Sequence, residues 1–560
     1  MILTGRLKIF ADASEKSAVK AAEELSCYLK KMTGEELSVE KTQALKNEGI
    51  YVGRIFAKDF GIDTNSLGSD GIAIFCKDDK LLFTGEGTRG TLYAVYSFLE
   101  DNGVRFYATD CEYIPQLSPI EVKDGYEKRY SPVITMRNVL WSDGMDPALT
   151  AKQKVNCCWQ RKFPEELGGG KKFAGYFCHT FGELAETGYE ASEPCLTDEK
   201  VYQTILKNVR QRLRDNPDAE YISVSQNDDF RFCTCENCKK IDDEEESHSG
   251  TMIRFVNRIA DDIKDEFPNV LIHTFAYQYT RKPPKFVRPR DNVIVQLCSI
   301  ECCFRHPLET CKTPAPAPWM EGTVGDFAED LREWHRIAKN IHIWDYTTDY
   351  HHYFAPFPNL RVLRENVQFF VKNGVTGVLE QGNINSPASG EFGALKNYLL
   401  TNLLWDPQIG EEEYEKMIDD FLCCYYGSGW KFIRQYIDAL HEETKDRHIG
   451  IYYHPLRILP PENGLPFMRK AQEWFEKAYS LAETKEQKTH VKKSMVQVKY
   501  YIQLATYKEN MSDTEKQEYE QKNKELWEVI NEEKIYLNPD ITLPETVDFS
   551  VSPDLWHKLG

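Results

Sequence analysis

The sequence YISVSQNDDFRFCTCENC, which covers residues 221–238, indicates the fold of the longest part of this chain. It begins with alternating β-branched residues, which are typical of a short buried strand. Asn227, Asp228 and Asp229 follow without a turn signal. Carboxylates and amides at the end of a strand are costly to bury unless water, a ligand or hydrogen bonds receive them. In an α/β barrel, catalytic groups lie at this end of the strands.

Strand-like and helical segments alternate from about residue 130 onward, which is the pattern of a parallel β/α array. Residues 253–267 and 362–371 carry apolar side chains at helical spacing between strand-like segments. We predict a TIM (β/α)8 barrel with strands at residues 135–140, 155–160, 175–180, 221–226, 270–277, 293–300, 341–346 and 377–380. Because the second and third units have weak patterns, an incomplete or distorted barrel stays open.

The 560 residues are too many for a single core, and we expect three domains. They are an N-terminal α/β accessory domain at residues 1–128, a catalytic barrel at 129–425 and an all-α domain at 426–560. In the first domain, residues 71–85 predict a β-hairpin and the segment after it a helix. Strand signals cease in the last domain, where long amphipathic helices are expected.

The chain has 69 Lys and Arg against 88 Asp and Glu, a net charge of −19. This charge argues against nucleic acid or an anionic membrane as a partner, because a binding patch would have to overcome the repulsion. No apolar run approaches the ~18–20 residues of a membrane span, and residues 1–5 lack a leader pattern. The compartment is cytoplasmic or, if a leader has been removed, exported or periplasmic.

Most polar candidates end a predicted strand and face a single cavity if the barrel prediction is right. Carboxylates, amides, imidazoles and aromatic rings form a lining that suits a polyhydroxylated ligand such as a sugar. The candidates for catalysis are Asp228, Asp229, Glu301 and Glu380. The candidates for substrate binding are Arg137, His179, Asn227, His306, Trp344, Asp345 and Tyr346.

Hydrolysis of a glycosidic bond needs a carboxylic acid to protonate the leaving oxygen and a second group that attacks or activates water. We assign Asp228 as the general acid and Glu380 as the base, nucleophile or substrate-orienting group. Asp229 is a substitute that would orient an acetamido group if the substrate supplies the nucleophile. Structural alternatives are a cap for Asp228, a loop charge for Asp229 and a salt bridge for Glu380.

Sixteen cysteines are present, and three of them, Cys233, Cys235 and Cys238, lie within six residues. Three thiolates come close to a structural zinc site, which needs a fourth ligand. Cys302, Cys303 or Cys311 could supply it. A disulfide within the group and free thiols are the alternatives. Any metal here is expected to be structural, and no cofactor is expected for catalysis.

Two resemblances to known families follow from longer motifs. TGEGTRGTLYAVYSFLEDNGVRFYATD, residues 84–110, resembles the small accessory domain that precedes the barrel in bacterial α-glucuronidases and β-hexosaminidases. Four blocks in order resemble glycoside hydrolase family 163 and the wider bacterial family of unknown function that includes it. These blocks are VSQNDDFRFCTCENC, QLCSIECCFRHPL (296–308), IHIWDYTTDYHHYFAPFPNLRVL (341–363) and GVTGVLEQGNINSP (374–387).

The second resemblance implies an endo-β-N-acetylglucosaminidase that acts on complex N-glycans, and it adds Asn359 to the substrate-binding candidates. We therefore expect a glycoside hydrolase with a glycan as its substrate, most similar to a β-N-acetylglucosaminidase. One alternative is an α-glucuronidase-like hydrolase in which Arg137, Arg305 or His306 holds the substrate carboxylate. Another is a glycan-binding protein built on a barrel without activity. The sugar, the linkage, the stereochemical outcome and the oligomeric state stay open.

Overall fold

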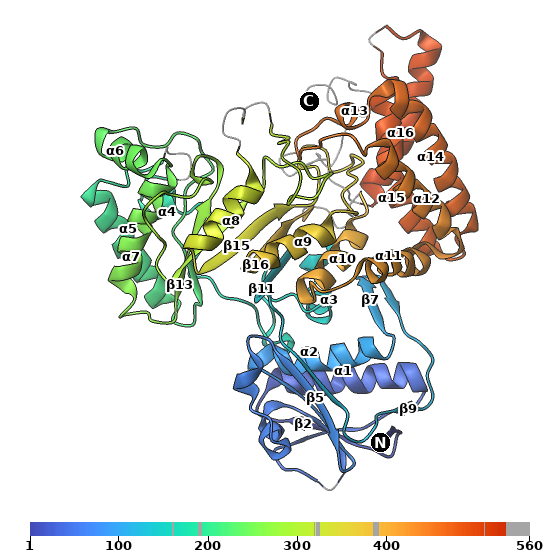
Figure 1. The fold of residues 1–560 in the computed structure, drawn as a ribbon. Coiled ribbons are helices and arrows are strands. Elements are labelled where there is room, and N and C mark those ends of the chain that lie inside the picture. The colour runs from blue at the N-terminus through green and yellow to red at the C-terminus, as the bar shows by residue number, and fades with distance from the viewer. Residues whose placement is uncertain are drawn as a thin grey trace. The chain divides into compact units, whose positions relative to one another are not determined.

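The computed structural model describes residues 1–46, 48–158, 162–188, 193–317, 320, 325–384, 391–508 and 510–533. The chain forms two compact units, Met1–Gly170 with Ala394–Gly427 and Lys171–Gly393 with Ser428–Gly560. Figure 1 shows a mixed sheet near the N-terminus, a parallel half-barrel of the TIM type and a helical region near the C-terminus. This architecture confirms the predicted fold class.

The first unit is built on a six-stranded mixed sheet with the order β10-β5-β6-β4-β2-β3. Helices α1 (Lys16–Thr33) and α2 (Gly87–Asp101) contribute the buried side chains of Leu25 and Leu92 to the same apolar core as Phe83 of the sheet. The predicted hairpin is present, since β5 and β6 pair antiparallel. The strands of the sheet are β2 (Ile9–Asp12), β3 (Val39–Thr42), β4 (Gly49–Val52), β5 (Ile72–Lys77), β6 (Lys80–Gly85) and β10 (Glu127–Tyr130).

Shorter elements complete the first unit. Strands β1 (Ile2–Leu3) and β9 (Ile120–Glu121) form one small pair, and β7 (Arg105–Ala108) and β8 (Cys111–Tyr113) form another. The first strand predicted for the barrel is present as β11 (Met136–Leu140). The helices of this part are α3 (Pro147–Lys152), α10 (Gly393–Trp405) and α11 (Glu411–Tyr426).

The second unit contains five parallel strands in the order β16-β15-β14-β13-β12. They are β12 (Tyr221–Ser223), β13 (Leu271–Ala276), β14 (Val293–Cys298), β15 (Asn340–Tyr346) and β16 (Val375–Gln381). Because the strands are parallel, all five carboxyl ends reach the same edge. Helices α6 (Glu236–Glu245) and α7 (Ser249–Ile263) lie between β12 and β13 in the chain, α8 (Phe327–Ile337) lies between β14 and β15, and α9 (Leu363–Lys372) lies between β15 and β16. Helices α4 (Phe181–Leu184) and α5 (Glu199–Asp215) precede β12.

Two of the eight predicted barrel strands are wrong. Residues 155–158, the described part of the second, are irregular, and residues 175–180 contain no strand either. Gly175 and His179 adopt positive φ angles of 87° and 48°, which an extended strand does not allow. The end of this segment still lies beside the residues that come after β12, since Thr180 N and Phe181 N donate hydrogen bonds to Ser225 O. It therefore lines the edge of the sheet as a loop.

The C-terminal region of the second unit is helical, as predicted. Helix α14 (Pro461–Leu481) packs against α12 (Trp430–Glu443) and α15 (Lys485–Thr506), and α15 packs against α16 (Asp513–Glu532). A short helix, α13 (Pro455–Ile458), lies between α12 and α14 in the chain. Thr484 and Ser512 cap α15 and α16 through reciprocal capping boxes. Among the described residues, every helix is too short or too polar to cross a membrane.

Candidate functional site

The five parallel strands present one aromatic face near their carboxyl ends. Side chains alternate along a strand, so residues two apart share a face. Trp344 and Tyr346 of β15 share one face, with ring centroids 6.4 Å apart. Phe275 of β13 contacts the Trp344 ring at 5.9 Å, and Phe177 stacks on it at 5.6 Å. The rings of Phe177, Phe275 and Tyr346 are buried, so they form a packed aromatic cluster near the carboxyl ends of the strands.

Asp228 lies beside this aromatic face and is exposed to solvent. It follows β12, and the hydroxyl of Tyr277, which follows β13, donates a hydrogen bond of 2.9 Å to Asp228 Oδ1. Burial raises the pKa of Tyr346, and the charge of Asp228 contributes in the same direction. The two candidates Asp228 and Tyr346 therefore lie within electrostatic reach of each other. The accessible carboxyl group of Asp228 can exchange a proton with a bound ligand.

His179 is the histidine of this site. Its ring contacts Phe275 at 5.2 Å and Tyr277 at 6.2 Å, and its Nδ1 lies 2.9 Å from Gln226 O. Since a carbonyl only accepts, Nδ1 carries the proton and Nε2 is left as an acceptor. Burial lowers the pKa of His179, although the charge of Asp228 opposes this effect. A neutral imidazole therefore lies next to Asp228 at neutral pH.

Asn227 and Asn359 hold the loops of the site in place. The side-chain oxygen of the buried Asn227 accepts a hydrogen bond of 2.9 Å from Gly182 N, at the start of α4. The Asn359 amide donates to Thr347 O at 3.0 Å, directly after β15. In this structure both amides bind backbone groups, so their contacts position the loops on which Asp228 and Tyr346 depend.

Asp345 and Glu380 lie on the opposite face of the sheet from Trp344 and Tyr346. They occupy paired positions on β15 and β16, and their exposures are 2 % and 1 %. Ser299 Oγ donates to Asp345 Oδ1 at 2.5 Å, whereas neither carboxyl oxygen of Glu380 has a hydrogen-bond partner among the described residues. Burial raises the pKa of Asp345 to about 6, and burial with the neighbouring Asp345 raises that of Glu380 well above its usual range. The structure therefore does not bring Glu380 to the aromatic face with Asp228.

Glu301 forms part of a buried ion-pair network. Its carboxylate lies 2.8 Å from the Arg281 guanidinium, which also contacts Asp330 at 2.8 Å. Burial raises the pKa of Glu301, and Arg281 opposes the shift. With one cation between two carboxylates, the network is held together by charge, and it fixes the loop that follows β14.

Asp229, Arg137 and His306 have partners of their own. Asp229 pairs with the exposed Arg231, whose hydrogen bonds lower the pKa of the Asp229 carboxyl. Arg137 belongs to the first unit, where its fully buried guanidinium pairs with Asp70 at 2.7 Å. His306 Nε2 lies 2.6 Å from the backbone oxygen of Lys445.

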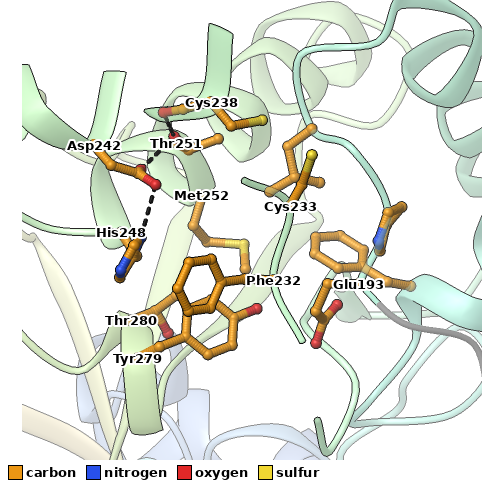
Figure 2. A pocket seen from close by; sticks show the side chains of 13 residues that line it. Glu193, Phe232, Cys233, Cys238, Asp242, His248, Thr251, Met252, Tyr279 and Thr280 are labelled. Atoms are coloured by element: carbon orange, nitrogen blue, oxygen red, sulfur yellow. Dashed lines mark hydrogen bonds and ion pairs between the residues drawn. The ribbon is translucent and has the colours of Figure 1, made fainter. Parts of the chain in front are cut away.

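Glu193 is a candidate that sequence reasoning missed. It lines a small pocket with Tyr279, Phe232 and His248 close to the cysteine cluster (Figure 2). Burial raises the pKa of Glu193 to about 8, and the charges of Asp229 and Asp228 add to the shift. A carboxyl group that titrates near neutral pH is typical of functional sites. Nothing in the local sequence around Glu193 indicates this role, because the pocket is assembled from distant loops.

The predicted cysteine site is completed by Cys195. The Cys195 Sγ atom lies 3.7 Å from Cys235 Sγ and 3.8 Å from Cys238 Sγ, and Cys233 belongs to the same group. Hydrogen bonds from the first turn of α6, led by Cys238 N, lower the pKa of the Cys235 thiol to about 6. Four thiolates at this spacing can hold a structural metal ion such as zinc. The prediction that Cys302, Cys303 or Cys311 supplies the fourth ligand is wrong, since these residues lie on a different loop.

The fold resembles that of a solved glycoside hydrolase. It is similar to a family GH115 4-O-methyl-α-glucuronidase, BtGH115A, described as specific for decorated arabinogalactans, with a TM-score of 0.59 and 13% identity over 98% of this chain and 82% of that one. CpGH84B is less similar, with a TM-score of 0.49 and 12% identity over 100% and 97% of the two chains. A mutant Streptomyces plicatus β-hexosaminidase in complex with GlcNAc is also less similar. Its TM-score is 0.42, with 11% identity over 75% of this chain and 90% of that one. At these identities the likeness concerns the fold alone.

The chain belongs to the family described as domain of unknown function DUF4838, whose model matches residues 106–438. A search of the curated proteins finds no match for it. The family match confirms the coarser part of the second resemblance, a family of unknown function. The narrower assignment to glycoside hydrolase family 163 stays a hypothesis.

Proposed function

We propose that this protein is a glycoside hydrolase with β-N-acetylglucosaminidase activity on glycans, and that Asp228 is its general acid. One observation carries the proposal: an exposed carboxyl group at the carboxyl end of β12 is held by the Tyr277 hydroxyl at 2.9 Å beside a wall of aromatic rings. A general acid needs solvent or substrate access and a fixed position, and Asp228 has both. The fold similarity to a glycoside hydrolase agrees with this role.

The second group of the reaction is better supplied by the substrate than by Glu380. Glu380 is buried on the other face of the sheet, and burial beside Asp345 raises its pKa, which favours the protonated form. A protonated, inaccessible carboxyl group is a poor nucleophile or base. Some glycosidases use the acetamido group of the substrate itself as the nucleophile. In that scheme Asp229, next to Asp228, is the candidate that orients the acetamido group.

The α-glucuronidase alternative requires a cation for the substrate carboxylate. The three basic residues suggested for this role are bound elsewhere. Arg137 pairs with Asp70, Arg305 donates to Thr444 Oγ1 at 3.1 Å, and His306 contacts Lys445 O. Next to Asp228, His179 is neutral because its burial lowers its pKa. A site with these groups favours an uncharged N-acetylated sugar over a uronic acid.

The test compares Asp228→Asn with wild-type protein on N-acetyl-β-glucosaminides whose leaving groups differ in acidity. Loss of a general acid slows a poor leaving group far more than a good one, because only the poor one needs a proton in the transition state. We expect a loss of about 10²–10⁴-fold in kcat for an alkyl or sugar leaving group. The loss for a dinitrophenyl leaving group should be much smaller. Circular dichroism should show an unchanged fold, since Asp228 is exposed.

Two further variants sharpen the result. Asp229→Asn should slow substrates with good and with poor leaving groups alike, if Asp229 orients the acetamido group of the substrate. Asp243→Asn, on the exposed face of α6, is the matched control and should keep wild-type rates. Equal activity of wild type and Asp228→Asn would contradict the proposal. Hydrolysis of aryl α-glucuronides alone would support the α-glucuronidase alternative instead. Binding of glycans without any turnover would indicate the inactive binding protein.

A further inference from the structure

A second group of side chains that could bind a metal ion lies away from the first cysteine cluster. Cys303, His306 and Cys311 come from the loop after β14, and His448 comes from the segment that follows α12. One ligand atom of each residue lies within 4.8 Å of the others. Cys303 Sγ is 3.4 Å from His306 Nδ1, and Cys311 Sγ is 3.5 Å from His448 Nδ1. Segments about 137 residues apart in the chain thus bring two thiols and two imidazoles together.

The spacing of these atoms fits a tetrahedral zinc ion. Zinc binds sulfur at about 2.3 Å and imidazole nitrogen at about 2.0 Å, so a nitrogen and a sulfur on one tetrahedron lie about 3.5 Å apart. The two nitrogen–sulfur pairs, at 3.4 and 3.5 Å, agree with this distance. Two sulfur and two nitrogen ligands in a tetrahedron are diagnostic of zinc among the common divalent metals.

The hydrogen bonds of His306 direct its free nitrogen toward the group. Its Nε2 lies 2.6 Å from Lys445 O, a backbone acceptor, so Nε2 carries the proton and Nδ1 presents its lone pair to Cys303. Metal-binding histidines usually donate their second ring N–H to a carbonyl or carboxylate in this way.

Cys303 is an interior residue of this group and not a surface thiol. Its sulfur lies 3.4 Å from His306 Nδ1. Cys303 is also 2 % exposed, which makes a role in surface chemistry unsuitable.

We propose that Cys303, His306, Cys311 and His448 bind a structural zinc ion that ties the loop after β14 to the segment after α12. The backbone already joins the same two segments, since Phe304 N donates to Ile449 O at 2.9 Å. Phe304 lies next to Cys303 in the chain and contacts the Tyr346 ring at 6.2 Å. The ion thus holds one wall of the aromatic face, although its binding does not depend on the proposed glycosidase activity.

The experiment measures metal content on the full-length protein by mass spectrometry after purification without chelators. With both cysteine groups loaded, wild type should carry two zinc ions per chain. His448→Gln and Cys311→Ser should each carry one, and Cys235→Ser, which removes a ligand of the first group, should also carry one. His335→Gln and Cys423→Ser change exposed residues outside both groups and should keep two. Cobalt bound to the Cys235→Ser variant should show the visible absorption of tetrahedral coordination, and this absorption should vanish when His448→Gln is added.

Two outcomes overturn the proposal. One is a Cys235→Ser variant without metal even after incubation with zinc. The other is a native disulfide between Cys303 and Cys311, found by peptide mapping without reduction. Should the ligand variants fail to fold, the wild type itself decides: alkylation of Cys303 and Cys311 must be slow with zinc bound and must accelerate at least about tenfold with a chelator. Equal rates count against the site.

Discussion

At the scale of single residues, two carboxyl groups at strand ends have opposite environments. Asp228 is exposed and accepts a hydrogen bond from Tyr277, so it has a fixed position and can meet a ligand. Glu380 is buried beside Asp345, and both carboxyl groups have raised pKa values. The two residues look alike in sequence, since each lies at the end of a predicted strand or directly after it. Their difference comes from which face of the sheet each one occupies.

The buried pair predicts an unusual dependence of stability on pH. Burial raises the pKa of Asp345 from 3.8 to about 6, so between these values the folded state binds more protons than the unfolded state. Stability should therefore fall as the pH rises from about 4 to above 6, the reverse of an ion-paired carboxylate. Asp345→Asn should remove about 2–3 kcal/mol of this loss, because its side-chain oxygen can still accept from Ser299. Urea unfolding at pH 4, 5, 6 and 8 measures the effect.

Asp243→Asn is the control for this measurement, because Asp243 is exposed on α6. It should follow the wild-type curve at every pH. If the plot of unfolding free energy against pH for Asp345→Asn runs parallel to that of wild type, the Asp345 carboxyl group is ionised in the folded state. Glu380→Gln should also flatten the curve, over a higher pH range. If Glu380 acts in catalysis despite its burial, this same variant loses turnover while it gains stability.

At the scale of elements, the first cysteine group connects helices to the site. Cys195 precedes α5, whereas Cys235 and Cys238 begin α6. The loop between β12 and α6 carries Asp228 and Asp229. It starts at a strand and ends at a candidate metal site, so both of its ends are fixed. Fixed ends limit the motion of the loop, and general acid catalysis requires such a fixed position of the acid.

Removal of a ligand should loosen this loop. In Cys235→Ser, amide exchange of residues 228–238 should accelerate at least about tenfold, which corresponds to about 1.4 kcal/mol of lost local stability. The strand β13 should keep its protection, because its hydrogen bonds to β12 and β14 are independent of the metal. Hydrogen exchange followed by mass spectrometry makes the comparison. Cys27→Ser, an exposed cysteine on α1, is the control, and equal exchange in both variants would contradict a structural role for the group.

At the scale of the whole molecule, each compact unit has a charged network in its interior. In the first unit, Asp70 binds Arg89 at 2.7 Å, Arg137 at 2.7 Å and the Asn156 amide at 2.6 Å. Arg137 is fully buried, so its charge needs the ion pair with Asp70 to be stable inside the unit. In the second unit, Arg281 plays the same part with Glu301 and Asp330.

Asp70→Asn should destabilise the first unit by about 3–5 kcal/mol, because it leaves the buried charge of Arg137 without compensation. Asp70 has a φ of 58°, a conformation that asparagine tolerates well, so the backbone itself should not be strained. Hydrogen exchange should show the loss in residues 1–170 and 394–427, while the zinc content of the second unit stays at the wild-type value. Asp79→Asn, at a comparable φ of 57° on a hairpin turn, is the control. A loss of unfolding free energy below about 1 kcal/mol would mean that other groups compensate the charge of Arg137.

The sequence alone determined much of the architecture. The hairpin β5–β6, the five strands β12 to β16 and the C-terminal helices follow from local apolar patterns, which tertiary contacts did not override. The two incorrect strands, at 155–160 and 175–180, have local patterns too weak to specify a strand, and positive φ angles at Gly175 and His179 end the extended conformation. Asp228 was found because polar residues directly after a buried strand must reach an edge of the sheet.

Only the tertiary structure decided the roles of the other groups. Cys195 and His448 join metal-type clusters from positions about 40 and 137 residues away from their partners, a distance across which no local pattern extends. Glu380 lies on the face of the sheet opposite Trp344 and Tyr346, because side-chain direction alternates along each strand and depends on where the strand begins in the sheet. Local free energies determine whether a segment is a strand or a helix. The packing of one element against another determines which side chains meet, and that packing is a property of the whole chain.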